Sequence, residues 1–206
     1  ELWKIENYEM FLQARRKLLA DSLNEWLEGI VETDLSGEEV SLEDLISVGE
    51  NEDLEFKETL RWDVHQEKVN KDLENVILKT ISAFSNVQGG QLLIGVNDSG
   101  EIVGLERDYK ALNGGGRDKF ELHIRNLIQG ALGQSFAATK INITFPEITG
   151  VEFCSIEIKP ANEPTYLKFS NKGGERIERF YVRSGNSSQE LSVSEAQKYI
   201  LERFHK

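Results

Sequence analysis

The sequence has little of the chemistry that secreted and membrane proteins use. Cys154 is its only cysteine, so no disulfide can form within the chain, and this usage is typical of a reducing compartment. No stretch approaches the ~18 consecutive apolar residues of a membrane span, and no charged-then-apolar leader opens the chain. We therefore expect a cytoplasmic protein with no membrane partner. Because the chain begins at Glu1 rather than at a methionine, we also expect it to be a fragment of something longer.

Basic residues are scarce in one stretch of the chain. The formal net charge is -12, which is unusual for a nucleic-acid-binding protein because phosphate contacts normally come from a basic surface. Fourteen of the 36 acidic residues lie between positions 21 and 60, where Lys57 is the only basic residue. The acidic run is typical of a solvated surface. The rest of the chain is close to neutral and has room for a basic face.

The first part of the chain has the pattern of a helical appendage. The full chain of 206 residues is long enough for one good hydrophobic core plus such an appendage. Apolar residues recur with a 3.6-residue period over positions 4–30, which predicts one long amphipathic helix. Ser41 opens a capping box for a short second helix. We predict an appendage over residues 1–48 and a separate domain over residues 49–206.

The pattern changes after Gly49 to alternating strands and helices. Such a pattern predicts an α+β fold, with a mainly antiparallel mixed sheet flanked by helices. Strands are expected at 54–57, 91–96, 140–145, 151–158 and 179–183, with a hairpin turn at 98–100. Helices are expected at 73–84 and 120–132, and a final helix is expected from a capping box at 192–195 to about residue 204.

Three motifs carry a family resemblance. The first is Gly-Glu-Asn-Glu-Asp-Leu-Glu-Phe-Lys at 49–57. The second is Ala-Phe-Ser-Asn-Val-Gln-Gly-Gly-Gln-Leu-Leu-Ile-Gly-Val-Asn-Asp at 83–98, followed by Ile-Val-Gly at 102–104. The third combines Glu-Pro-Thr-Tyr-Leu-Lys at 163–168 with Phe-Tyr-Val-Arg-Ser-Gly-Asn-Ser at 180–187. Together these motifs resemble the Schlafen-type AlbA-like domain from residue 49 almost to the C-terminus.

The resemblance implies a metal-dependent endoribonuclease with three acidic site residues. Carried over to this sequence, they are Glu50, Glu55 and Asp98, and the cofactor is Mg²⁺ or Mn²⁺. Carboxylates gathered around such an ion lower the pKa of a bound water and stabilise charge on a phosphodiester. Because Glu50 and Glu55 are five positions apart, Glu50 must fold back from a turn at Gly49 to meet Glu55. Lys57 lies on the same strand face as Glu55, where its ammonium can contact the scissile phosphate.

Simpler explanations of these acidic residues stay open. Asp98 begins an Asp-Ser-Gly turn, where an aspartate is favoured because its side chain caps the turn. Glu50 and Glu55 lie in an acidic tract where solvent exposure accounts for most residues. Asn97 stands where the family often has an aspartate, and this departure weakens the expected metal affinity.

Candidate nucleic-acid contacts lie in the second half of the chain. Arg179, Tyr181 and Arg183 alternate with the apolar residues Phe180 and Val182, so two guanidinium groups and a phenol are expected to share one strand face. Such a face suits phosphates and stacked bases, although a solvated strand has the same pattern. The expected surface extends to Lys168, Lys172 and Arg176.

Three functions are consistent with the sequence. The first is a metal-dependent endoribonuclease acting on structured, tRNA-like RNA as a toxin or antiviral defence effector. The second is a non-catalytic nucleic-acid-binding or regulatory module. The third is an ATPase, suggested by the glycine runs at 89–90 and 114–116 and disfavoured by the absence of a phosphate-binding loop motif. Because larger Schlafen proteins place two such lobes around RNA, the resemblance also implies a homodimer.

Overall fold

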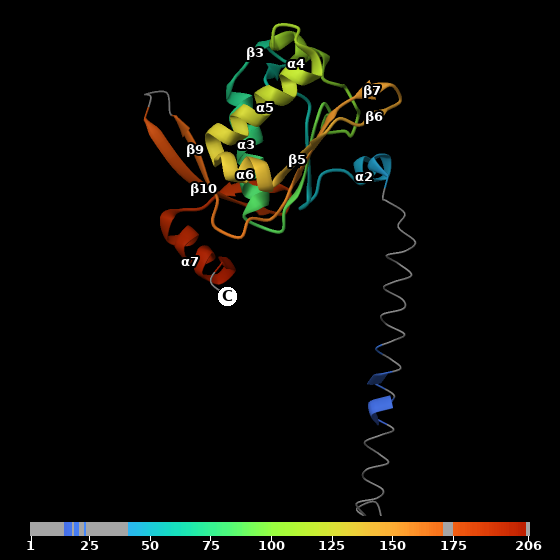
Figure 1. Ribbon diagram of the computed structural model, residues 1–206. Helices are drawn as coiled ribbons and strands as arrows, with labels where there is room; N and C mark the ends of the chain where they lie inside the picture. Colours follow the sequence, from blue (N-terminus) through green and yellow to red (C-terminus); the bar gives the residue numbers. More distant parts are fainter. Residues whose placement is uncertain (1–14, 18, 21–22, 24–40, 171–174, 205–206) are drawn as a thin grey trace, which may run out of the picture. The chain divides into compact units, whose positions relative to one another are not determined.

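The computed structural model describes residues 15–17, 19–20, 23, 41–170 and 175–204 (Figure 1). Contacts divide the chain into two compact units, residues 1–42 and residues 43–206. The described residues between positions 15 and 23 are helical and exposed, and most of the helix expected over residues 4–30 lies outside the described residues. The short second helix is α2 (Leu42–Val48). Nearly all of α2 belongs to the larger unit, whereas the sequence suggested a boundary after residue 48.

The larger unit contains a four-stranded mixed sheet. Its members are β1 (Leu54–Lys57), β4 (Gly90–Ile94), β8 (Cys154–Ile158) and β5 (Ile141–Thr144), in that order. Strands β1 and β4 run parallel, while β4 with β8 and β8 with β5 run antiparallel. The expected α+β fold with a mainly antiparallel sheet is therefore confirmed.

A second sheet is formed by the C-terminal third of the chain. Strand β10 (Arg176–Ser184) lies between β9 (Tyr166–Ser170) and β11 (Ser187–Glu190), and both pairs are antiparallel. The final helix, α7 (Val193–Phe204), begins at the expected capping box. The Ser192 hydroxyl donates to Glu195 Oε2 at 2.6 Å, and this bond lowers the pKa of the Glu195 carboxyl.

Helix α3 (Asp72–Ser85) lies between the two sheets and contacts strands of both (Figure 1). Its Ile81 and Phe84 are fully buried in a core that also contains Leu92 of β4 and Phe120 of a second long helix. Cys154 belongs to the same core, as expected, and burial raises the pKa of its thiol. The remaining described elements are α4 (Glu106–Ala111), α5 (Gly116–Leu132), α6 (Gln134–Thr139), and the hairpins β2 (Trp62–Asp63) with β3 (Lys68–Val69) and β6 (Glu147–Ile148) with β7 (Val151–Glu152).

Asn86 follows α3 and ties it to the second sheet. The side chain is fully buried. Its amide nitrogen donates to the carbonyls of Thr165 and Tyr181 at 2.9 and 2.8 Å, and its amide oxygen accepts from Thr165 N at 2.9 Å. One side chain thus satisfies three backbone groups of the β9 and β10 region. Among the helices in the described part of the chain, none combines the length and apolar character needed to cross a bilayer.

The Asn86 contacts predict a large stability effect. Asn86→Ala removes three hydrogen bonds to buried or partly buried backbone groups, so we expect it to lower the free energy of unfolding by about 2–4 kcal/mol. Urea denaturation followed by circular dichroism measures the change. Asn142→Ala removes an amide that is exposed on β5 and is expected to cost less than about 0.5 kcal/mol. Equal urea midpoints for the two variants would show that Asn86 does not tie α3 to the second sheet.

Candidate functional site

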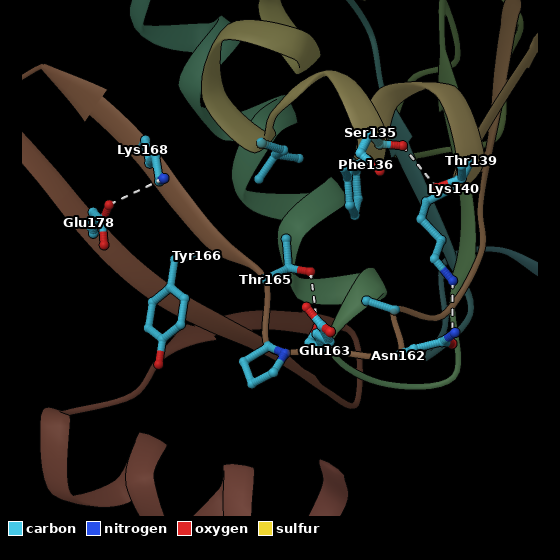
Figure 2. A pocket seen from close by; sticks show the side chains of 13 residues that line it. Ser135, Phe136, Thr139, Lys140, Asn162, Glu163, Thr165, Tyr166, Lys168 and Glu178 are labelled. Atoms are coloured by element: carbon cyan, nitrogen blue, oxygen red, sulfur yellow. Dashed lines mark hydrogen bonds and ion pairs between the residues drawn. The ribbon is translucent and has the colours of Figure 1, made fainter.

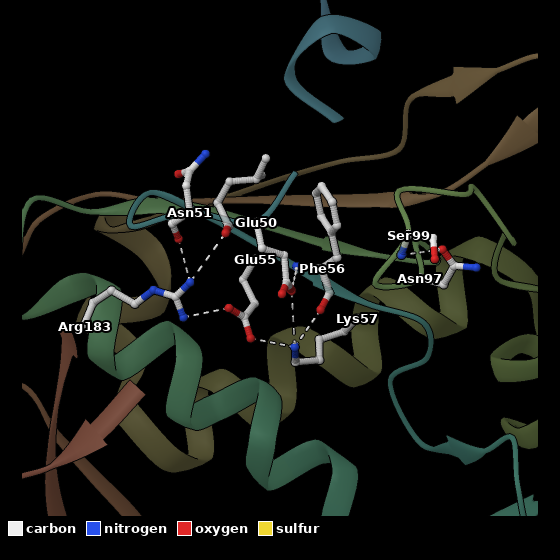
Figure 3. A network of polar contacts seen from close by, with 9 residues as sticks. Glu50, Asn51, Glu55, Phe56, Lys57, Asn97, Ser99 and Arg183 are labelled. Carbon is white, nitrogen blue, oxygen red and sulfur yellow. Dashed lines mark hydrogen bonds and ion pairs between the residues drawn. The ribbon is translucent and has the colours of Figure 1, made fainter. Parts of the chain in front are cut away.

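Glu55 lies at the centre of a cluster of charged side chains. It is on β1 between two buried neighbours and is itself only 8 % exposed. Its Oε1 accepts a hydrogen bond from Lys57 Nζ at 2.6 Å, and its Oε2 lies 2.6 Å from Arg183 Nη1. Figure 3 shows Lys57 and Arg183 on either side of the Glu55 carboxylate. As expected for residues two apart on a strand, Glu55 and Lys57 share one face.

Glu50 reaches the same cluster from the turn that precedes β1. Gly49 has a φ of +82°, a left-handed conformation that suits glycine and turns the chain back. Glu50 Oε1 accepts from Phe56 N at 2.8 Å and lies 3.8 Å from Lys57 Nζ. Lys57 Nζ also donates to the carbonyl of Phe56 at 2.6 Å. The fold-back of Glu50, which the spacing required, is confirmed.

Arg183 joins this cluster from the second sheet. Its side chain is only 2 % exposed. The Nη2 atom donates to the carbonyl of Asn51 at 2.7 Å, and the guanidinium lies 4.9 Å from the centre of the Phe84 ring. Its contact with Glu55 is short but poorly aligned as a hydrogen bond, so the attraction is mainly ionic. The expectation that Arg183 lies on an open nucleic-acid-binding face is wrong.

The same correction applies to Tyr181. It is 4 % exposed, and its hydroxyl donates to Glu190 Oε2 at 3.2 Å. Burial and the nearby Glu190 carboxylate raise the pKa of Tyr181 to about 12. The physical reason is that β10 is covered on both sides: Tyr181 packs in the main core with α3, while Phe180 and Val182 pack against α7. Arg179 remains exposed and pairs with Glu190.

Asp98 is not brought into the cluster. It is exposed and lines a cavity of about 350 Å³ with Glu43 and Ser47 of α2. The turn is capped by its neighbour Asn97, whose Oδ1 accepts from Ser99 N and Glu101 N at 3.1 and 2.9 Å. Figure 3 shows Asn97 and Ser99 to one side of the Glu50 and Glu55 carboxylates. The expected convergence of three acidic residues is therefore not found.

The donor set does not fit a divalent ion as it is arranged. Within the described residues, no three acidic, histidine or cysteine side chains are placed to hold a metal together. Glu50 and Glu55 do approach each other, but the Lys57 ammonium stands between them and contacts both. The charges of the four residues also balance, with two carboxylates against Lys57 and Arg183. As arranged, the four side chains neutralise one another's charge.

Comparison with known families decides the classification. The family model described as "Schlafen, AlbA_2" matches residues 50–192, which is well over half of the chain. The chain belongs to the Schlafen AlbA_2 family. Membership supports a function related to nucleic acid, and it agrees with the resemblance carried by the three sequence motifs.

Two solved structures resemble this Schlafen AlbA_2 chain at low identity. A protein from Corynebacterium diphtheriae is 19% identical with a TM-score of 0.48, and the match covers 74% of this chain and 27% of that one. The N-terminal domain of a protein from Nitrosomonas europaea, named as related to the ATP-dependent DNA helicase RecG, is 21% identical with a TM-score of 0.38 over 68% and 83% of the two chains. This chain thus spans about a quarter of the C. diphtheriae protein. Among curated proteins, no match was found.

A groove on the Schlafen AlbA_2 domain lies between α6 and β9 (Figure 2). It encloses about 530 Å³. Lys168, one of the expected binding residues, lines it and pairs with Glu178 at 3.5 Å, with 62 % and 58 % of the two side chains exposed. Arg176 is exposed on β10, and Lys172 lies outside the described residues. We define the "α6–β9 groove" by Ser135, Thr139, Lys140, Asn162, Tyr166 and Lys168; Phe136, Glu163, Thr165 and Glu178 also line it.

Of the six residues that define this groove, sequence reasoning had identified only Lys168 as a binding residue. Tyr166 appeared only as part of a family motif, yet it is 39 % exposed beside Lys168. Two features of the sequence could have indicated an exposed Tyr166: Pro164 lies two residues before it, and the alternation of the motif places Tyr166 and Lys168 on one strand face. Lys140 Nζ donates to the carbonyl of Pro160 at 2.8 Å and lies 3.4 Å from Asn162 Oδ1. No sequence signal pointed to Lys140, because its place depends on the pairing of β5 with β8.

The buried ion pair predicts that replacing two arginines of β10 by alanine lowers stability by unequal amounts. Arg183→Ala removes the buried guanidinium from Glu55 Oε2 and from the Asn51 carbonyl, while Lys57 still contacts Glu55 Oε1, so we expect a loss of about 3 kcal/mol in the free energy of unfolding. Arg179→Ala removes an exposed pair with Glu190 and is expected to cost less than about 1 kcal/mol. Thermal and urea denaturation of both variants measure the difference. Similar losses in the two variants would contradict the buried role of Arg183.

Proposed function

We propose that this domain binds nucleic acid, with RNA as the preferred class, through the α6–β9 groove. The observation that carries the proposal is an exposed tyrosine beside an exposed lysine, Tyr166 and Lys168, in a groove of the domain surface. Aromatic side chains stack on unpaired bases whatever their sequence, and a neighbouring cation holds the phosphate. Family membership supports a nucleic-acid ligand in general.

Lys168 is available for a phosphate at little cost. Its partner Glu178 is more than half exposed and 3.5 Å away, and such a solvated pair contributes little stability. A phosphate can therefore replace Glu178 as the partner of Lys168. Because few cations line the groove, we expect a shallow dependence of affinity on salt, with a slope of about one to two in log units.

The polar groups of the groove favour RNA over DNA. Ser135 and Thr139 of α6 and Asn162 before β9 present hydroxyl and amide groups along the groove (Figure 2). Ribose adds a 2′-hydroxyl that donates and accepts hydrogen bonds, and such groups let a protein tell RNA from DNA. The structured, tRNA-like substrate, the homodimer and the cytoplasmic location implied by the sequence stay predictions.

Binding through this groove predicts that substitutions of its lining residues lower the affinity for RNA. Tyr166→Ala removes the stacking surface, so we expect the affinity for labelled tRNA to fall by about tenfold or more. Lys168→Ala is expected to weaken binding and to reduce the salt slope by about one. Electrophoretic mobility shifts at several salt concentrations, with single-stranded DNA of equal length as competitor, measure both effects. Lys198→Ala changes an exposed lysine of α7 outside the groove and is expected to bind normally. If Lys198→Ala weakens binding as much as Lys168→Ala, the attraction is non-specific.

Metal-dependent RNA cleavage is the second candidate function, and one observation favours it. Glu50 and Glu55 approach one cationic group from a turn and a strand, which is the convergence that the family resemblance implies for two of three site residues. For activity, Lys57 must leave the space between them, and Asp98 must approach.

The second candidate predicts cleavage that depends on Mn²⁺ and on two carboxylates. If the domain is an endoribonuclease, labelled tRNA is cleaved with Mn²⁺, and Glu55→Gln and Asp98→Asn each slow cleavage by about a hundredfold or more. Glu52→Gln changes an exposed neighbouring acid and is expected to cleave normally. Circular dichroism shows whether Glu55→Gln, at a buried position, still folds. Asp98 is exposed, so Asp98→Asn tests the need for a carboxylate with no loss of folding expected. Absence of cleavage, or equal cleavage by all variants, leaves nucleic-acid binding as the function.

A further inference from the structure

A second surface cavity lies away from the α6–β9 groove. It encloses about 410 Å³ and is lined by Trp62, Val64 and Glu67 of the β2–β3 hairpin and by Arg107 and Lys110 of α4. Figure 1 shows β3 close to α4, and β2 contacts α4 directly. The volume lies within the range of about 300–1,000 Å³ that is usual for small-molecule sites. None of these five residues lines the groove assigned above.

A buried carboxylate fixes the two sides of this cavity relative to each other. Asp108 of α4 is fully buried. Its two oxygens accept from Leu60 N at 2.8 Å and Arg61 N at 2.9 Å, immediately before Trp62. The Thr59 hydroxyl then donates to the carbonyl of Trp62 at 2.5 Å. The strand that bears Trp62 is thus tied to the helix that bears Arg107 and Lys110, and the cavity is held ready for a ligand.

The lining combines an aromatic ring, two cations and one acid. Arg107 pairs with Glu58 at 2.7 Å, but half of its side chain is exposed. Lys110 is exposed. Indole rings stack well on nucleobases, and guanidinium and ammonium groups bind phosphate. Glu67 is the one carboxylate in the lining, and a carboxylate accepts hydrogen bonds from ribose hydroxyls.

We propose that this cavity binds a nucleoside phosphate, with the base on Trp62, the phosphate on Arg107 and Lys110, and the sugar hydroxyls on Glu67. The ligand is either a free nucleotide or one nucleotide of a strand. The two sources present the same chemistry to these residues. The site is separate from the α6–β9 groove, so it does not depend on nucleic-acid binding there.

Tryptophan fluorescence tests the site directly. The chain has three tryptophans, so the full-length variant Trp3→Phe/Trp26→Phe reports on Trp62 alone. We expect AMP or a short single-stranded oligonucleotide to quench this fluorescence to saturation, while adenosine and inorganic phosphate each act more weakly. Saturation by AMP identifies a free nucleotide as the ligand, and saturation by the oligonucleotide alone identifies a nucleotide within a strand; both support the site.

Charge variants in the same background decide the outcome. Lys110→Gln is expected to weaken the affinity for AMP, measured by quenching, by about tenfold. Because Lys110 is exposed, this variant is expected to fold normally. Lys198→Gln, on α7, serves as the matched control. Tyr166→Ala must leave AMP quenching unchanged, which separates this site from the proposed groove. No quenching by any probe, or equal affinities for Lys110→Gln and Lys198→Gln, would overturn the proposal even if RNA binding by the groove is confirmed.

Discussion

The ion pair between Arg183 and Glu55 is the contact on which the arrangement of the domain depends. It joins strand β10 of one sheet to strand β1 of the other, at 2.6 Å and almost without solvent. A buried ion pair is costly unless its remaining polar atoms find partners. Lys57 and the carbonyl of Asn51 supply two such partners, and the Phe84 ring of α3 lies against the guanidinium, whereas the buried Arg183 Nε has no hydrogen-bond partner among the described residues. The charges of Glu55 and Lys57 in the first motif are therefore explained in large part by sheet packing.

Much of the fold was predictable because local patterns determine it. The alternation of β5 and β8, the helical period of α5 and the capping box of Ser192 all lie within short windows, and the structure confirms them. The fold-back of Glu50 was predictable for a different reason. Successive residues of a strand face opposite ways, so side chains five apart meet only if the chain turns between them. The family resemblance implied that these two acids meet, and their spacing showed how the chain must turn to bring them together.

The rest of the site depends on contacts that no short window contains. Strand period places Arg179, Tyr181 and Arg183 on one face, but it does not reveal that α3 covers that face next to Arg183 and Tyr181. The choice between Asn97 and Asp98 as the turn cap depends on one residue of register. The groove and the Trp62 cavity are each assembled from segments far apart in sequence. Of these residues, only Lys168 and the motif that contains Tyr166 gave a signal in the sequence.

The polar contacts of β1 have a consequence for the solution behaviour of the protein. Strand β1 is the last member of its sheet, with β4 as its one neighbour there. The outward backbone groups of Phe56 would be free to pair with a strand of another molecule, but Glu50 accepts from its N–H and Lys57 donates to its carbonyl. Charged side chains at such an open edge are a known protection against aggregation. The same residues that suggested catalysis therefore keep separate copies of the chain from joining their sheets.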